Sequence, residues 1–248
     1  MDNHVFATAL SIAMAVSPLA VHASELKVLA GGSMTASLKE LGPRFEKATG
    51  HKLDITFAPT PELIKMATSA PFDLGVVPID VMKNDGARAR FAGAPGNIAR
   101  VGYGVAVKTG APKPDVSTPE ALKATLLKAQ SIAVFPASAA GAYVQKTFER
   151  LGIAEQIKDK SKVQAAPGAI PQVVAKGEAE LGVFLTNVLL APGVELAGPF
   201  PGDLQNELVF VGGVAAESKD PAAAKAFLDY LKTPEASAVF KAKGVTPG

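Results

Sequence analysis

Two periodicities divide the chain past residue 24. Short apolar runs, typical of buried strands, alternate with segments in which apolar residues recur every three or four positions, as on one face of a helix. The predicted strands are Lys27–Leu29, Leu53–Phe57, Leu74–Val77, Val101–Val107, Ile132–Phe135, Leu181–Leu185 and Leu208–Ala215. The predicted helices are Thr35–Thr49, Pro61–Ser69, Thr118–Ala129, Gly141–Leu151, Ile170–Lys176 and Pro221–Ala242.

Strands separated by helices predict an α/β fold with βαβ units and a mainly parallel sheet. In open sheets of this class, ligands bind in the crevice beyond the carboxyl ends of the strands. Three turns with small polar residues follow such ends, after Leu29, Phe57 and Phe135. We therefore expect a ligand crevice where these turns meet.

The turn after the first strand is the strongest candidate for an anion site. Two glycines and Ser33 lead from the strand into an amphipathic helix. Free backbone N–H groups, the serine hydroxyl and the positive end of the helix dipole would meet there, and such a point binds anions. The expected contacts are the hydroxyl of Ser33 and the amides of Met34 and Thr35. The alternative is that Ser33 is a plain helix N-cap, a position that serine fills well.

Two further turns supply candidates. Thr60 lies between two prolines that cannot donate an N–H, and its hydroxyl would either contact a ligand or cap the following helix. After Phe135, four small residues would let the backbone approach a ligand closely, unless they form an ordinary strand–helix loop. These four are Ser138, Ala139, Ala140 and Gly141. Ala169, in the turn before another predicted helix, would offer an amide in the same way.

Five segments of the chain have counterparts, in the same order and spacing, in one known family. They are residues 26–50, 57–63, 72–80, 135–143 and 222–236. In them the chain resembles the molybdate-binding and related periplasmic solute-binding proteins of type II architecture. The resemblance implies two lobes joined by two hinge strands, with the ligand cleft between them. Lobe one would comprise residues 24–104 plus 208–248, and lobe two residues 105–207.

Two long runs, Arg100–Lys108 and Glu207–Ala215, look like the hinge strands. The glycines within them fit backbone bending or close approach of another segment. They are Gly102, Gly104, Gly212 and Gly213. The alternative is that they mark bulges in one continuous sheet.

The resemblance also implies a small anion as ligand and an ABC-type permease as partner. Two departures from the family pattern widen the choice of ligand. Members that bind tetrahedral oxyanions usually have a serine-rich second turn, where this chain has only Thr60. They typically have a tyrosine at the position of Leu185, which Thr186 or Asn187 would have to replace as a donor. An organic carboxylate therefore fits at least as well as an inorganic oxyanion.

Some proteins of this architecture, the periplasmic aconitate isomerases, are enzymes. Moving a double bond beside carboxylates requires anion clamps and one base. Glu62 would be that base, with Tyr103 or Lys108 near the hinge as further participants. Glu62 also suits the first turn of a helix electrostatically, which needs no catalytic role. A third reading, an adhesion or structural domain, would lack a closing cleft.

Composition narrows the remaining classes. The chain of 248 residues has a net charge of +2, which gives no electrostatic case for nucleic acid or an anionic membrane surface. It has no cysteine, so disulfides, thiolate nucleophiles and thiolate-bound zinc are excluded. Histidine occurs only at positions 4, 22 and 51. We therefore expect neither a metal site nor a cofactor, and we expect His51 at the surface.

The first residues resemble a secretory signal. An apolar run, Phe6–Ala20, is followed by Val21, His22 and Ala23, which suits signal peptidase cleavage after Ala23. The run is too short to span a bilayer as a helix, which needs about 20 apolar residues. The segment before it lacks the expected Lys or Arg. Residues 1–23 are thus predicted to be a signal peptide, with the mature chain exported to the periplasm as a monomer.

Overall fold

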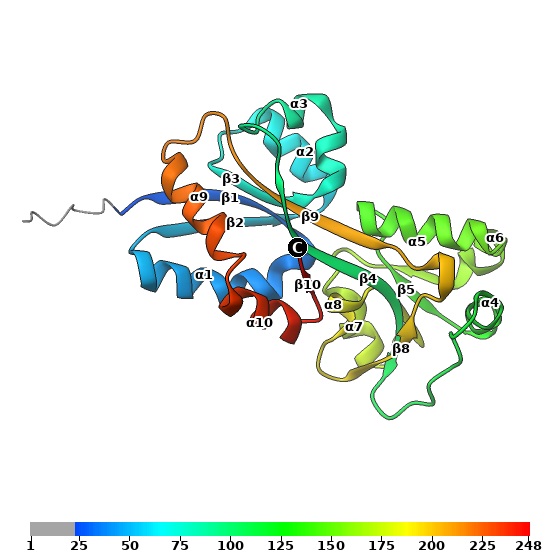
Figure 1. Cartoon of the computed structure of the whole chain (residues 1–248). Coiled ribbons are helices and arrows are strands. Elements are labelled where there is room, and N and C mark those ends of the chain that lie inside the picture. Colours follow the sequence, from blue (N-terminus) through cyan, green and yellow to red (C-terminus); the bar gives the residue numbers. More distant parts are fainter. Residues whose placement is uncertain (1–22) are drawn as a thin grey trace, which may run out of the picture.

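A mixed ten-stranded sheet, covered by helices, runs through both halves of the molecule (Figure 1). The computed structural model describes residues 23–248, so the predicted signal peptide lies outside the described residues except for Ala23. The strands are β1 (Glu25–Gly31), β2 (Lys52–Ala58), β3 (Leu74–Pro78), β4 (Gly96–Lys108), β5 (Ile132–Val134), β6 (Ser161–Val163), β7 (Leu181–Leu185), β8 (Val194–Pro199), β9 (Glu207–Val214) and β10 (Thr246–Pro247). The α-helices are α1 (Thr35–Thr49), α2 (Thr60–Ser69), α3 (Asp85–Arg88), α4 (Pro119–Lys128), α5 (Ala139–Arg150), α6 (Ala154–Ile157), α7 (Ala169–Ala175), α8 (Thr186–Leu189), α9 (Pro221–Tyr230) and α10 (Pro234–Ala242).

The expectation of a mainly parallel sheet was wrong. Parallel pairing is confined to β1 with β2 and β3, and to β5 with β6 and β7. The long strand β4 runs antiparallel to β7, β8, β9 and β10, and β9 runs antiparallel to β3. The reason is that β4 and β9 carry the chain between the two halves, so no right-handed βαβ crossover joins them to their neighbours.

The helical pattern over Pro221–Ala242 corresponds to two helices, α9 and α10. Helix α9 ends at Tyr230, and Thr233 begins α10 by accepting a hydrogen bond at its side chain from the N–H of Ala236 (3.3 Å). Strands β6, β8 and β10 were not predicted, because they are short or only partly buried and so lack a periodic signal. None of the helices in residues 23–248 is long and apolar enough to cross a membrane.

The two halves are defined by the partners of β4. Up to Gly102 this strand pairs with β9, and from Tyr103 onward it pairs with β7 and then β8. We call the half with β1, β2, β3, β9, β10, α1–α3, α9 and α10 lobe one, and the half with β5–β8 and α4–α8 lobe two (Figure 1). The change of partners lies close to the predicted boundary after residue 104, and the boundaries themselves remain a prediction.

The Gln205 side chain, just before β9, links that segment to β4 at the point where the chain passes between the lobes; we call this link the Gln205 clamp. Its Oε1 accepts a hydrogen bond from the N–H of Tyr103 (2.9 Å), and its Nε2 donates to the carbonyl of Tyr103 (3.0 Å). The side-chain amide of Gln205 thus pairs with the backbone of Tyr103 as a neighbouring strand would, just before β9 begins at Glu207. A Cβ on Gly102 would lie 3.3 Å from this amide, and one on Gly104 would lie 2.8 Å from the carbonyl oxygen of Gly198. The hinge glycines therefore allow close approach.

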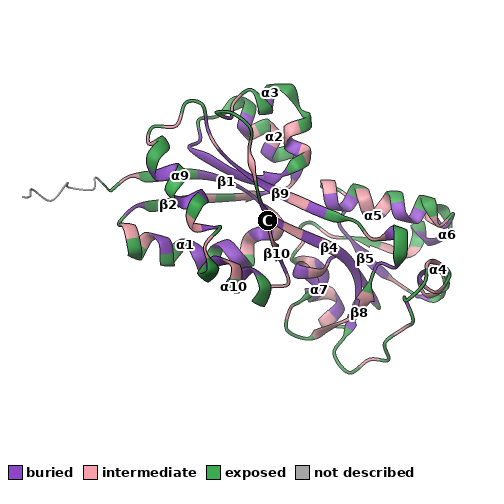
Figure 2. Cartoon of the chain, viewed as in Figure 1, coloured by how far each residue is buried: buried purple, intermediate pink, exposed green. Residues whose placement is uncertain are grey.

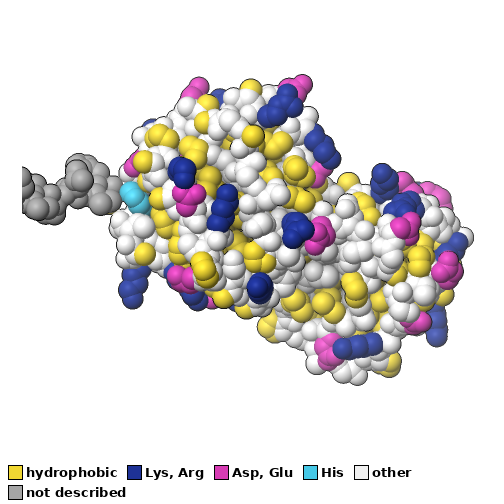
Figure 3. All heavy atoms as spheres, in the orientation of Figure 1, with side chains coloured by type: hydrophobic (Ala, Val, Ile, Leu, Met, Phe, Trp, Pro, Cys, Tyr) yellow, Lys and Arg dark blue, Asp and Glu magenta, His cyan; other side chains and the backbone are white. Residues whose placement is uncertain are grey.

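Buried strands and half-buried helices form the core (Figure 2). Leu38, Leu41 and Phe45 of α1 face it. The expectation that His51 is a surface residue was wrong, because the residue is only 8% exposed and its ring stacks on Phe45 with centroids 6.1 Å apart. Its Nδ1 accepts a hydrogen bond from the N–H of Ser24. On the face shown in Figure 3, charged side chains of both signs are interspersed, in keeping with the small net charge.

The Gln205 clamp gives a test of this hinge. Gln205→Ala removes three hydrogen bonds, two with Tyr103 and one from the N–H of Asn206, so we expect the free energy of unfolding to fall by about 1–3 kcal/mol in urea denaturation. The neighbouring exposed residue supplies the control, since Asn206→Ala should change that energy by less than about 0.5 kcal/mol. Equal effects of the two substitutions would show that the clamp contributes nothing.

Candidate functional site

The carboxyl ends of the parallel strands in the two lobes face each other across a cleft. From lobe one, β1 leads through a short 3-10 turn (Gly32–Met34) into α1, and β2 leads through Pro59 into α2. From lobe two, the turns after β5, β6 and β7 lead into α5, α7 and α8. The ligand crevice expected from open α/β sheets therefore lies between the lobes.

Ser33 lines this cleft and does not cap α1. The helix is preceded by Met34 without any side-chain capping bond, and the Thr35 hydroxyl instead donates to the Gly32 carbonyl (2.6 Å). Ser33 is half-buried, and the Met34 side chain is fully buried in the core. Met34 therefore has only its backbone to offer, whereas the Ser33 hydroxyl is free of the capping role.

Thr60 and the start of α5 meet directly across the lobes. The Thr60 hydroxyl accepts a hydrogen bond from the N–H of Ala139 (3.2 Å), and Thr60 is itself buried. Ser138 is the N-cap of α5, with its hydroxyl accepting from the N–H of Gly141 (3.0 Å). Both hydroxyls act as acceptors in these bonds, so each keeps its own proton for donation.

A small cavity lies where these three hydroxyl-bearing residues converge. Ser33, Thr60 and Ser138 line it together with Ala140 and apolar neighbours, and its volume is about 20 Å³. We call it the constriction. That volume is just enough for one water molecule, which needs roughly 10–15 Å³. An anion of several heavy atoms would enter only after the lobes move apart.

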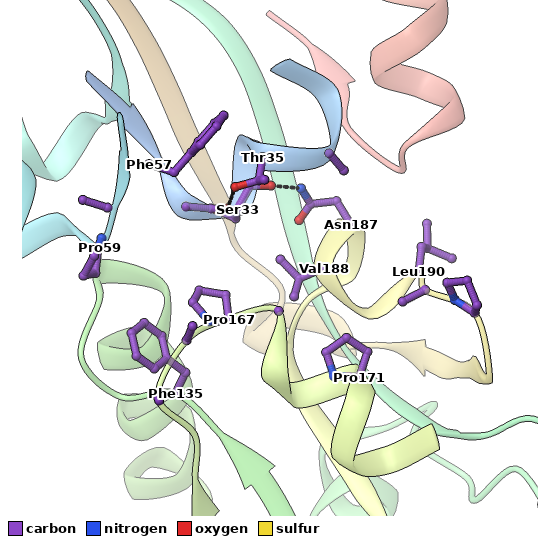
Figure 4. Close-up of a pocket in the computed structure, with 18 residues that line it drawn as sticks. Ser33, Thr35, Phe57, Pro59, Phe135, Pro167, Pro171, Asn187, Val188 and Leu190 are labelled. Atoms are coloured by element: carbon purple, nitrogen blue, oxygen red, sulfur yellow. Dashed lines mark hydrogen bonds between the residues drawn. The ribbon is translucent and has the colours of Figure 1, made fainter. Parts of the chain in front are cut away.

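A second cavity of about 540 Å³ lies beside the constriction and shares five lining residues with it, Gly32, Ser33, Ala58, Pro59 and Pro167. Figure 4 shows it between the turns of the two lobes. Of its 18 lining residues only Ser33, Thr35 and Asn187 are polar, and none is charged. We call it the apolar cavity.

Asn187 reaches the cleft and Thr186 does not. The Nδ2 of Asn187 donates to the Ser33 carbonyl (2.7 Å), a second bond between the lobes (Figure 4). Its Oδ1 is buried without a hydrogen-bond partner among the described residues. Thr186 instead donates to the carbonyl of Gly102 (3.2 Å), and Leu185 is fully buried.

The residues suggested for acid–base chemistry lie away from both cavities. Glu62 is exposed in the first turn of α2, and Lys108 is exposed at the end of β4. Burial, reinforced by Asp80 and Tyr143, raises the pKa of Tyr103 well above its ordinary value, so its phenol stays neutral. Tyr103 borders another hollow, beside Lys83 and Lys146. Within residues 23–248, no three His, Asp or Glu side chains lie together as a metal site would require.

The remaining expected contacts lie beside the cavities. Ala169 is the first residue of α7, directly after Pro167 and Gly168, which line the apolar cavity. Gly141 is buried in the first turn of α5, where a Cβ would lie only 1.9 Å from the carbonyl oxygen of Phe135. Glycine therefore lets this turn pack onto the end of its strand.

Sequence reasoning missed the residues that make the cleft apolar. Phe57 and Phe135 lie at the strand ends from which the crevice was predicted, so their positions could have indicated that aromatic side chains line it. The segment from Val188 to Pro192 carried no comparable signal, because it begins inside a short helix, α8, that was not predicted.

Comparison with known proteins agrees with this geometry. The chain matches the profile of bacterial extracellular solute-binding proteins over residues 26–246. It belongs to this family. An aconitate isomerase from Pseudomonas sp is 33% identical over 96% of this chain and 94% of its own. The molybdate-binding protein ModA of Azotobacter vinelandii is 32% identical over 91% of each chain.

The solved periplasmic molybdate-binding protein of Azotobacter vinelandii is similar in fold, with a TM-score of 0.73 and 19% identity over 89% of this chain and 98% of its own. The predicted periplasmic binding fold is thereby confirmed, with a mixed sheet in place of the mainly parallel one.

The tight turn at the start of α5 can be tested by substitution. Alanine normally stabilises a helix relative to glycine, but Gly141→Ala would force a Cβ into the Phe135 carbonyl. We expect it to lower the free energy of unfolding by about 2 kcal/mol or more. Gly168→Ala is the matched control, because its Cβ would meet no atom within 4 Å, and it should change stability by less than about 1 kcal/mol. A Gly141→Ala protein as stable as wild type would contradict the packing described.

Proposed function

We propose that this protein binds a small anion in the cleft between its lobes and delivers it to an ABC-type permease. The observation that carries the proposal is the convergence of Ser33, Thr60 and Ser138, from both lobes, on one constriction. Helices α1, α2 and α5 all begin there, so their positive ends point at the same place. The relatives named as molybdate-binding proteins support the same class of ligand.

Neutral donors suit a protein that must release its ligand. No Lys, Arg or His lines either cavity, so charge would be compensated by hydroxyls, amides and helix dipoles. A buried ion pair would have to be broken on release, and leaving one partner uncompensated is strongly unfavourable. Bonds to neutral donors exchange with water at a smaller cost.

Binding and closure would be coupled. The bonds from Asn187 to Ser33 and from Ala139 to Thr60 join the lobes at the residues proposed to hold the anion. The hinge at Tyr103 would let the lobes separate so that an anion can enter, and the anion's own hydrogen bonds to the same residues would then join the lobes in place of these direct bonds. This supports a binder that closes over its ligand.

The cellular setting is part of the proposal. The apolar segment before Ala23 supports export with cleavage after that residue, and the similar solved structure named as a periplasmic molybdate-binding protein supports the periplasm. We propose that the mature protein acts as a monomer, because both sides of the cleft come from one chain.

The similarity to an aconitate isomerase favours a second candidate, an isomerase of unsaturated tricarboxylic acids. Such a reaction needs a base near the substrate carbon. No residue lining the constriction or the apolar cavity carries a carboxylate, imidazole, amine or phenol, and Glu62 lies outside both. The geometry therefore supports binding better than catalysis.

The first experiment measures thermal unfolding and calorimetric binding of the mature protein with molybdate, tungstate and organic carboxylates. A ligand at about 100 times its Kd adds about 2.7 kcal/mol of stability. Ser33→Ala should weaken binding roughly ten- to hundredfold, the cost of one hydrogen bond to a charged group. Ser69→Ala, exposed at the far end of α2, should not alter affinity. If no anion raises the midpoint, the proposal fails.

A second experiment separates binding from catalysis. We expect the mature protein to interconvert cis- and trans-aconitate no faster than buffer alone when the two isomers are followed by proton NMR. Glu62→Gln should leave anion affinity unchanged within about twofold, since Glu62 is exposed and lines neither cavity. Turnover by the wild type that disappears in this variant would establish the isomerase and identify its base.

A further inference from the structure

The apolar cavity is larger than a small inorganic anion requires. Its volume of about 540 Å³ lies within the range of roughly 300–1,000 Å³ found for sites that hold organic ligands. It adjoins the constriction, and Ser33 lines both. A ligand held by Ser33 would therefore have room for a further body of many atoms.

The lining of this cavity cannot neutralise a second charge. Its three polar side chains are Ser33, Thr35 and Asn187, and none of the 18 residues is ionisable. The Thr35 hydroxyl already donates to Gly32, and one of the two N–H groups of the Asn187 amide donates to Ser33. A second carboxylate placed here would exchange its water for at most the other N–H of Asn187 and no positive charge, which is costly.

The shape of the lining favours a flat or branched apolar group. Phe57 from lobe one and Phe135 from lobe two lie on different sides of the hollow, and Pro171 and Val188 close it further (Figure 4). Aromatic and proline rings present rigid surfaces, so little side-chain freedom is lost when a ring packs on them.

We infer that the ligand is an organic anion with one charged group and an apolar body, the charged group at the constriction and the body in the apolar cavity. This inference rests on the proposed function and names the class of its ligand. It predicts discrimination against both inorganic oxyanions, which leave the cavity empty, and di- or tricarboxylates, which place a charge in it.

Pairs of ligands that differ only in the body test the inference by calorimetry on the mature protein. We expect phenylphosphonate to bind at least tenfold more tightly than methylphosphonate, and benzoate at least tenfold more tightly than acetate. The two headgroups distinguish a tetrahedral from a planar anion. Molybdate and trans-aconitate should bind more weakly than the better phenyl compound.

A cavity-filling variant locates the body. Gly168 lines the apolar cavity, and a Cβ there would meet no atom within 4 Å, so Gly168→Leu should fold while occupying the space. We expect its loss of affinity for phenylphosphonate to exceed its loss for methylphosphonate by at least tenfold. Ala226→Leu, on the exposed side of α9, is the control for an added side chain and should alter neither.

The outcomes separate this inference from the function on which it rests. Equal binding of phenyl and methyl compounds, equal losses in Gly168→Leu, or tightest binding of molybdate or trans-aconitate would overturn the inference and leave anion binding standing. Failure of every anion to bind would overturn both. Loss of phenylphosphonate binding in Ser33→Ala together with selective loss in Gly168→Leu would support both.

Discussion

The change of pairing partners along β4 is the constraint on which the rest of the structure depends. One strand belongs to both lobes, pairing with β9 up to Gly102 and with β7 and β8 beyond it. Because it runs antiparallel to its neighbours, the parallel strands of the two lobes end facing each other. The turns after β1, β2 and β5 are thereby brought together from distant parts of the chain. The two hydrogen bonds between Gln205 and Tyr103 hold this crossing point.

The cleft that results is polar at one point and apolar elsewhere. Hydroxyls and helix N-termini gather at the constriction, while prolines, alanines and two phenylalanines line the adjoining cavity. Removing water from such a site strengthens each hydrogen bond to an anion, since the local dielectric constant is low. The same environment penalises any charge that lacks a donor. Selectivity among anions would therefore depend both on the donors at the constriction and on the lack of donors in the apolar cavity.

Much of the fold could be predicted because its signals are local. The spacing of Leu38, Leu41 and Phe45 predicted the bounds of α1, and the rule about strand ends predicted that the turns at Ser33, Thr60 and Ser138 lie at one crevice. Strand direction could not be read this way, since β4 and β9 have the same apolar pattern whether parallel or antiparallel. Nor could the burial of His51, which depends on stacking with Phe45 and on a bond from Ser24. The apolar cavity required tertiary contacts between segments far apart in sequence.

The most direct test of the central claim is the position of the anion in crystals of the mature protein grown with tungstate and, in parallel, with phenylphosphonate. Density for either anion between Ser33, Thr60 and Ser138, with its oxygens within hydrogen-bond distance of hydroxyls or amides from both lobes, is the predicted result. Density found for both anions only outside the constriction would contradict the account.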